Sequence, residues 1–309
     1  MRILICDLFA NGNGNDAIPY DSIIHIPDIT TCTNGDVLNK GDIFNISKDD
    51  IIIFSANEDG MHYVKKINMT IPSLFAKMID IRSALKKQYP GIVIYNDPIH
   101  FDDIGNKLHT YNLLQHLKYI PTYSQFPDEK WDTFPCIVSA SRASGGRFRT
   151  RCNTSDELIN SGRRIQRAKG STFIVECIDS YIPELKCMHN LRLMVVNDTL
   201  VDWFCRPGKE WNIHTGTQDL EKLQLANDWF VEWCEKHKHK QTVTTFISDI
   251  FSVIGKGAYS YDVIIVDDMM YLCEVGYKFW DDTVAKTIPL DKLTKSKEAY
   301  KEQLKRLIL

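Results

Sequence analysis

The chain has 309 residues, of which 44% are hydrophobic and 25% charged, and its formal net charge at pH 7 is -3. This composition predicts a globular protein of two or three subdomains and gives no reason to expect nucleic-acid binding. No apolar run reaches the roughly 18 residues of a membrane span, and the N-terminal sequence lacks a signal-peptide layout. We therefore expect a cytoplasmic protein without membrane partners.

Nine cysteines are scattered along the chain, with no Cys-x-x-Cys pair. Most lie in predicted strands beside apolar residues, where a free thiol behaves as a small apolar side chain. We therefore expect reduced, structural cysteines rather than disulfides or a zinc site.

Residues 1–100 have the pattern of a small parallel α/β domain. Apolar runs at 2–8, 50–54 and 92–95 predict buried strands, and apolar residues at helical spacing predict a helix over 73–89. Strand, helix and strand in this order are typical of a parallel sheet. Gly12 and Gly14 lack the third glycine and following helix of a dinucleotide site, so they predict a polar loop.

A glycine turn between two short strands is the most distinctive feature of the middle of the chain. The runs 136–138 and 148–152 predict the strands, and Gly145 and Gly146 predict the turn. The nearby positive charges are Arg142, Arg147 and Arg149. Adjacent glycines adopt conformations that a Cβ resists, and they can direct N–H groups at an anion. The turn is either a flap that closes over phosphates or an ordinary hairpin with solvated arginines.

Further elements flank this turn on both sides. The predicted elements are a helix over 103–117 with Lys107 near its start, a helix from a Ser155 cap to 169, a strand over 172–178, a hairpin of 191–196 with 200–205, helices over 220–235 and 243–254, and a hairpin over 261–276. The basic run at 235–240 predicts a solvated helix end.

In this order the segments resemble the ATP-grasp superfamily, and within it the RimK-type and glutathione-synthetase-like carboxylate–amine ligases. The resemblance covers roughly residues 90–285. It rests on these segments in sequence order: Asn96-Asp-Pro98, Asn106-Lys107, Phe134-Pro-Cys-Ile-Val138 with Gly145-Gly146, Phe173 to Ile178, Asn190-Leu-Arg192, Cys205-Arg206, Trp211 to Gly216, Tyr261-Asp262 and Cys273-Glu-Val-Gly276. It implies an α/β (α+β ATP-grasp) fold with a pre-ATP-grasp domain over 1–100. A central lobe over 101–180 and a C-terminal lobe over 181–309 would clasp ATP.

The resemblance also implies a function and roles for individual residues. The reaction would join a small-molecule or peptide carboxylate to an amine through an acyl phosphate, releasing ADP and phosphate. ATP would be bound by Lys107, Ser139, Arg142, Gly145, Gly146 and Arg147, by Glu176, Cys177 and Ile178 at adenine, and by Glu184 at the ribose. Arg192, Arg206 and Asn212 would be catalytic, and His214 in the same loop is either a further residue that orients phosphate or acceptor or an ordinary loop histidine. Asp262 and Glu274 would bind Mg²⁺, or Mn²⁺ in its place.

Two residue pairs are chemically suited to these roles whatever the family. Asp262 and Glu274 lie on adjacent strands of a predicted hairpin, where side chains on one face reach a shared ion, and Mg²⁺ prefers hard oxygen ligands. Arg192 and Arg206 lie on facing strands, and arginine binds phosphate or carboxylate through two hydrogen bonds. The alternative for each pair is solvated surface residues.

Two positions depart from the family pattern. Ser139 stands where the family has a second phosphate-binding lysine, and Gly276 stands where it has a metal-binding asparagine. Arg142 or Arg147 would have to supply the missing charge, and Asn212, Asp281 or water the missing ligand. An ATP-binding relative that is kinase-like or an inactive scaffold is therefore the main alternative, and the basic run alone suggests an interaction module. The sequence does not define the acyl donor, the amine or the oligomeric state.

Overall fold

The structure is a computed structural model that describes residues 3–7, 22–25, 46–55, 71–100, 106–142, 146–214, 217–236 and 239–276, with Glu302 and Arg306. These residues belong to two compact units. The first unit contains the described residues of 1–102, 254–259 and 276–309. The second unit contains those of 103–253 and 260–275. The loop at Gly12 and Gly14, the flap residue Gly145 and the suggested ligand Asp281 lie outside the described residues.

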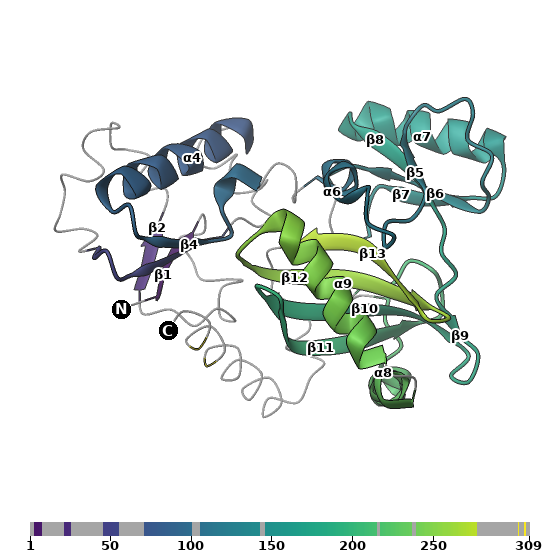
Figure 1. Ribbon diagram of the computed structural model, residues 1–309. Helices are drawn as coiled ribbons and strands as arrows, with labels where there is room; N and C mark the ends of the chain where they lie inside the picture. Colours follow the sequence, from purple (N-terminus) through teal and green to yellow (C-terminus); the bar gives the residue numbers. More distant parts are fainter. Residues whose placement is uncertain are drawn as a thin grey trace. The chain divides into compact units, whose positions relative to one another are not determined.

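A parallel sheet in the order β2-β1-β3-β4 forms the first unit, as the N-terminal apolar runs predict (Figure 1). The elements are β1 (Ile3–Asp7), β2 (Ser22–His25), β3 (Ile51–Ser55), α4 (Ile71–Gln88), β4 (Val93–Tyr95) and the 3₁₀ helix η1 (Pro98–His100). Residues 51–54 are all buried, which is typical of a parallel strand covered on both faces. Helix α4 buries Met78, Ile81 and Leu85, which lie on one face because they are three and four residues apart.

The second unit begins with an antiparallel sheet in the order β5-β8-β6-β7. The elements are α6 (Lys107–Leu114), β5 (Tyr123–Gln125), β6 (Cys136–Ala140), β7 (Arg149–Cys152), α7 (Ser155–Lys169) and β8 (Thr172–Glu176). Two hydrogen bonds similar to those of a capping box start α7: the Thr154 hydroxyl accepts from Glu157 N–H at 3.3 Å, and the Glu157 carboxylate accepts from the N–H of Asn153, one residue before the cap, at 2.7 Å. The cap is therefore Thr154, one residue before the predicted Ser155.

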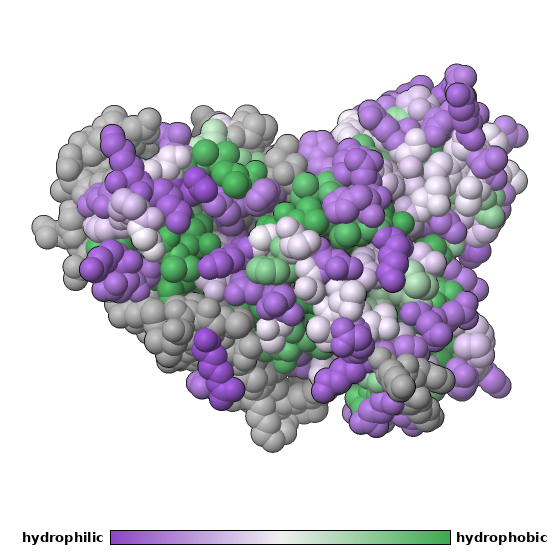
Figure 2. All heavy atoms as spheres, in the orientation of Figure 1, coloured by the Kyte–Doolittle hydropathy of each residue, from purple (hydrophilic) through white to green (hydrophobic). Residues whose placement is uncertain are grey.

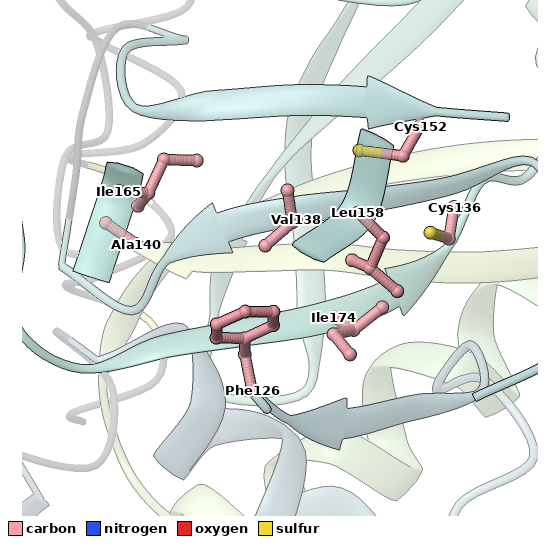
Figure 3. Close-up of a cluster of buried hydrophobic side chains, with 8 residues drawn as sticks. All are labelled: Phe126, Cys136, Val138, Ala140, Cys152, Leu158, Ile165 and Ile174. Carbon is pink, nitrogen blue, oxygen red and sulfur yellow. The ribbon is translucent and has the colours of Figure 1, made fainter. Parts of the chain in front are cut away.

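Every second residue of β6 packs into a hydrophobic core between this sheet and α7. Eight buried side chains fill it: Phe126, Cys136, Val138, Ala140, Cys152, Leu158, Ile165 and Ile174 (Figure 3). Because successive strand residues point to opposite faces, Ile137 and Ser139 point away from α7. The outer surface of α7 is hydrophilic (Figure 2), and its exposed arginines include Arg163 and Arg164.

A second sheet in the order β11-β10-β12-β13, with β9 paired to β10, continues the unit. The elements are β9 (Tyr181–Ile182), β10 (Cys187–Val196), β11 (Thr199–Gly208), η2 (Leu220–Lys222), α8 (Leu223–Lys236), α9 (His239–Ile254), β12 (Ala258–Val266) and β13 (Met269–Gly276). Contacts between aromatic rings place α8 and α9 on one face of this sheet. The ring centroids of His189 (β10) and Trp229 (α8) are 4.9 Å apart, and those of Tyr261 (β12) and Phe246 (α9) are 6.2 Å apart. Residues of β10 and β12 that alternate with these point to the opposite face.

Several sequence expectations are corrected by the structure. Helix α6 begins at Lys107 rather than 103, because Asn106 is its extended N-cap and accepts from His109 N–H. His239, expected at a solvated helix end, is buried and stacks on Trp233 at 3.9 Å between ring centroids. The short strands β2, β5 and β9 were not predicted. None of the helices in the described ranges is long and apolar enough to cross a membrane.

Candidate active site

The site is built on the sheet face that α7 leaves uncovered. A second cluster, the α6 cluster, covers part of this face and consists of Leu108, Tyr111, Ile137, Phe173 and Val175, with Trp211 packed against it. The Tyr111 hydroxyl donates to the Cys273 carbonyl of β13, with 3.1 Å between the oxygens. Leu272 N–H also donates to the Tyr119 carbonyl, at 2.8 Å. These two bonds join α6 and the segment after it to β13, so polar residues of both sheets meet beside α6.

Asp262 of β12 holds two arginines of the second sheet. Its carboxylate accepts from Arg192 Nε at 2.7 Å and Nη2 at 3.0 Å, and from Arg206 Nη2 at 3.1 Å. Burial alone would raise the pKa of the Asp262 carboxyl, but the charges of Arg192 and Arg206 outweigh it and lower the pKa to about 2. Two guanidinium groups and one carboxylate leave one net positive charge, so the cluster is suited to hold a further anion.

Lys107 and Glu274 form a second ion pair. The Lys107 ammonium lies 3.2 Å from the Glu274 carboxylate, and the two side chains are 14% and 27% exposed. The first residue of α6 is Lys107, whose N–H donates to the Ser141 carbonyl just beyond β6 at 2.9 Å. The backbone thus fixes the lysine beside the turn that follows β6.

The thiol of Cys273 shows that the charged groups converge. Burial raises the pKa of this thiol to about 12. Two cations, Arg149 and Lys107, act in the opposite direction, while two carboxylates, Asp262 and Glu274, add to the increase. Because these effects fall with distance, all four charges lie near one point on β13.

The glycine turn contacts the loop that follows β11. Gly146 has a φ of +70°, and its carbonyl accepts from Asn212 Nδ2 at 3.2 Å. A Cβ at Gly146 would lie 2.8 Å from His214 Cδ2 and 2.9 Å from Asn212 Oδ1. Both the backbone conformation and the close approach therefore require glycine. Of the turn arginines, Arg147 is exposed.

Ser139 cannot take over the chemistry of a lysine, because it carries no charge. It is buried, and its hydroxyl donates to the Ala140 carbonyl at 3.2 Å. Its partner across the hairpin is Arg149 of β7, which points to the same face because directly paired residues share a face. The Arg149 guanidinium carbon lies 5.2 Å from the centre of the Trp211 ring. Arg142, just after β6, is half-buried.

The expected adenine segment lies at the end of β8. The Glu176 carboxylate accepts from Thr122 N–H at 3.4 Å, and Cys177 N–H donates to the Pro135 carbonyl at 3.1 Å. The Cys177 N–H is therefore engaged, and the backbone group left for a base is its carbonyl; Ile178 beside it is half-buried. Glu184, expected at the ribose, is exposed in the turn between β9 and β10.

The residues expected to bind a metal have oxygen atoms suited to a divalent ion, but they are too few to complete its coordination. Asp262 and Glu274 are carboxylates on neighbouring strands, and the buried Oδ1 of Asn212 has no hydrogen-bond partner among the described residues, so it is an oxygen suited to a further bond. In the described part of the chain, no group of three or more His, Cys, Asp or Glu side chains could hold a metal ion. Any ion would therefore need oxygen ligands from other sources.

Comparison with known proteins identifies the architecture. No protein-family model and no curated protein sequence matches the chain. The ATP-grasp ligase PsnB, solved with the precursor peptide PsnA2 and AMPPNP, aligns over 96% of this chain and 97% of its own, with a TM-score of 0.55 and 12% identity. The chain has the ATP-grasp fold. The D-alanine–D-alanine ligase of Bacillus anthracis with ATP aligns over 98% of each chain, with a TM-score of 0.51 and 13% identity.

A third solved structure covers a longer protein. The N5-carboxyaminoimidazole synthetase of Staphylococcus aureus with ADP aligns over 89% of this chain and 63% of its own, with a TM-score of 0.50 and 10% identity. Identities this low establish the ATP-grasp fold alone.

Most of the residues that meet beside α6 could be named from the sequence, but three of them were given no role in the site. Lys107, Arg192, Arg206, Asp262 and Glu274 lie in the two ion-paired groups described above. Glu184 and Arg147 are exposed and contribute nothing to those groups. The three without a role are Tyr111, which was not named, Arg149, which was named only as a positive charge near the turn, and Trp211, which was named only within a motif. Counting the β6–β7 hairpin pairs outward from the turn would have brought Arg149 opposite Ser139.

Proposed function

We propose that the chain is an ATP-dependent ligase that joins a carboxylate to an amine through an acyl phosphate, releasing ADP and phosphate. The observation that carries the proposal is the pair of ion-paired groups, Arg192–Asp262–Arg206 and Lys107–Glu274, beside the turn of an ATP-grasp fold. Activating a carboxylate brings several negative charges together, so cations must converge at the reacting groups.

Each side chain in these groups has a role in the proposal. ATP supplies the phosphoryl group that activates the carboxylate. Lys107 binds a phosphate oxygen, and Glu274 keeps the ammonium in position until the nucleotide enters. Arg192 and Arg206 bind the substrate carboxylate and then the acyl phosphate. Asp262 orients both guanidinium groups, since it accepts hydrogen bonds from each.

The nucleotide is held by further residues in this proposal. Gly146 donates its N–H to a phosphate. Gly145, Arg142 and Arg147, from the same stretch of chain, also bind the phosphates. The adenine base lies against Glu176, Cys177 and Ile178, and Glu184 binds the ribose. Asp262 and Glu274 bind Mg²⁺ or Mn²⁺, and Asn212 adds its free carboxamide oxygen.

The proposed carboxylate and amine substrates are small molecules or peptides. The D-alanine–D-alanine ligase acts on a small molecule, as its name says, whereas PsnB was solved with a precursor peptide. A substrate screen therefore needs both classes, and the protein is assigned to the cytoplasm without nucleic-acid or membrane partners.

The test is ADP release measured across a panel of carboxylates with amino-acid and peptide amines. We expect release that depends on both partners, and we expect Asp262→Asn combined with Glu274→Gln to reduce it to background. The matched control is Asp228→Asn with Glu235→Gln, two exposed carboxylates of α8. Equal turnover in a folded Asp262/Glu274 variant would remove the metal assignment.

The alternative function has its own signature. Ser139 and Gly276 favour an ATP-grasp protein that binds nucleotide without ligation, because each replaces a residue that the family uses. A parent protein that binds Mg·ATP but releases no ADP with any acid and amine would establish that alternative.

A further inference from the structure

Arg149 is a partly buried cation without a carboxylate partner in the described part of the chain. Its Nε atom is inaccessible to water and has no hydrogen-bond partner there. Three carboxylates of the site are engaged elsewhere, because Glu274 is paired with Lys107, Asp262 with two other arginines, and Glu176 accepts from Thr122 N–H. A buried charge is costly unless an opposite charge compensates it. The position therefore calls for an anion that enters the site from outside.

The surroundings of Arg149 fix where that anion would lie. The register of the β6–β7 hairpin pairs Arg149 with Ser139, and both side chains point to the face covered by the α6 cluster. Trp211 lies 5.2 Å from the guanidinium carbon and limits its movement. Lys107 lies beside the same end of β6, because its N–H donates to the Ser141 carbonyl, two residues beyond Ser139.

We propose that Arg149 binds the phosphates of the nucleotide together with Lys107, supplying across the hairpin the positive charge that Ser139 lacks. This assignment rests on the proposed function, since it requires ATP in the same site. A guanidinium on β7 reaches the space in front of Ser139 from the neighbouring strand, about 5 Å away. Its fork of donors suits a phosphate with several oxygens.

Arg149 is better suited to this role than the turn arginines that sequence alone suggested. Arg147 is exposed, whereas Arg149 is partly buried against Trp211. An arginine held by a strand pair and an aromatic ring loses little freedom when it binds, so its contact with phosphate is stronger than that of a solvated side chain.

The experiment measures equilibrium binding of adenosine, ADP and AMPPNP by calorimetry. We expect Arg149→Met, which keeps an unbranched side chain, to weaken AMPPNP binding about 10- to 100-fold. Adenosine binding should stay within about twofold of the parent, because it carries no phosphate. Arg149→Lys should recover part of the affinity for AMPPNP. Ser139→Lys in the Arg149→Met background should do the same, because it returns the charge to the facing position.

The control is Arg163→Met, which removes an exposed arginine of α7 and should bind all three ligands like the parent. A parent that binds adenosine and AMPPNP equally well, or binds neither, refutes both this assignment and the proposed function. A parent that prefers AMPPNP, with an Arg149→Met variant that matches it, refutes only this assignment. Equal losses for adenosine and AMPPNP in Arg149→Met also refute it, since the residue would then act on the site as a whole.

Discussion

His189 of β10 makes the stability of the second sheet sensitive to mild acid. The side chain is 1% exposed and bonded through both ring nitrogens. Nε2 accepts from Ile265 N–H at 3.0 Å, so the neutral ring carries its proton on Nδ1, which donates to the Ser180 carbonyl at 2.6 Å. Burial lowers the pKa of His189 from 6.5 to about 4.

The size and sign of the effect follow from that pKa. Between pH 6.5 and about 4, the unfolded chain carries the proton and the folded chain does not. The stability that neutral His189 contributes is therefore fully present above about pH 6.5 and is lost as the pH falls toward 4. The interval of about 2.5 pH units corresponds to about 3 kcal/mol, or about 1.4 kcal/mol per pH unit.

The assay is urea unfolding followed by tryptophan fluorescence, at intervals from pH 7.5 to 4.5, for the parent and His189→Gln. The variant should be less stable at pH 7.5, and its deficit should shrink by 2–3 kcal/mol, or about two pKa units, by pH 4.5. His116→Gln removes an exposed histidine and controls for the substitution itself. A deficit that stays constant over the whole range would refute the reasoning.

Two glycines of the second unit give further predictions. Gly146→Val should slow ADP release at least about tenfold with little change in the urea midpoint, because a φ of +70° and the contact with Asn212 both exclude a branched side chain; unchanged kinetics would show that the turn has no part in turnover. Gly162→Ala should lower the free energy of unfolding by about 1–2 kcal/mol, since its Cβ would overlap the Phe126 ring and overpacking outweighs the gain in helix propensity. Gly91→Ala, with open space around the new Cβ, is the control for the second change, and equal midpoints for the two variants would contradict it.

Local chemistry made the hairpins predictable from sequence. The β6–β7 hairpin and the pair of strands that became β10 and β11 could be predicted because alternating apolar residues flank a turn. Arg192 and Arg206 were correctly assigned to facing strands of one hairpin. The register shows them diagonal rather than opposite, with Arg206 across from Asn190 and Arg192 across from Phe204.

Partners far apart in the chain were not predictable in the same way. Lys107 and Glu274 are separated by most of the second unit, and no local pattern marks them as an ion pair. Asp262 was predicted to bind a metal ion and not to pair with Arg192 and Arg206, because the sequence does not show which residues of β10 and β12 lie side by side. His239 was placed in solvent because the surrounding lysines dominate the composition, although the ring of Trp233, six residues earlier in the chain, stacks on it.

The contact between Gly146 and Asn212 has a consequence for how fast a nucleotide can enter. One side-chain hydrogen bond links the turn residue to the loop after β11. A neutral hydrogen bond of this kind is worth about 0.5–1.5 kcal/mol, which favours the joined arrangement over the parted one only about 2- to 13-fold. A substantial fraction of molecules then has this bond broken at any moment. Nucleotide entry past this point would be limited by diffusion rather than by waiting for a rare conformation.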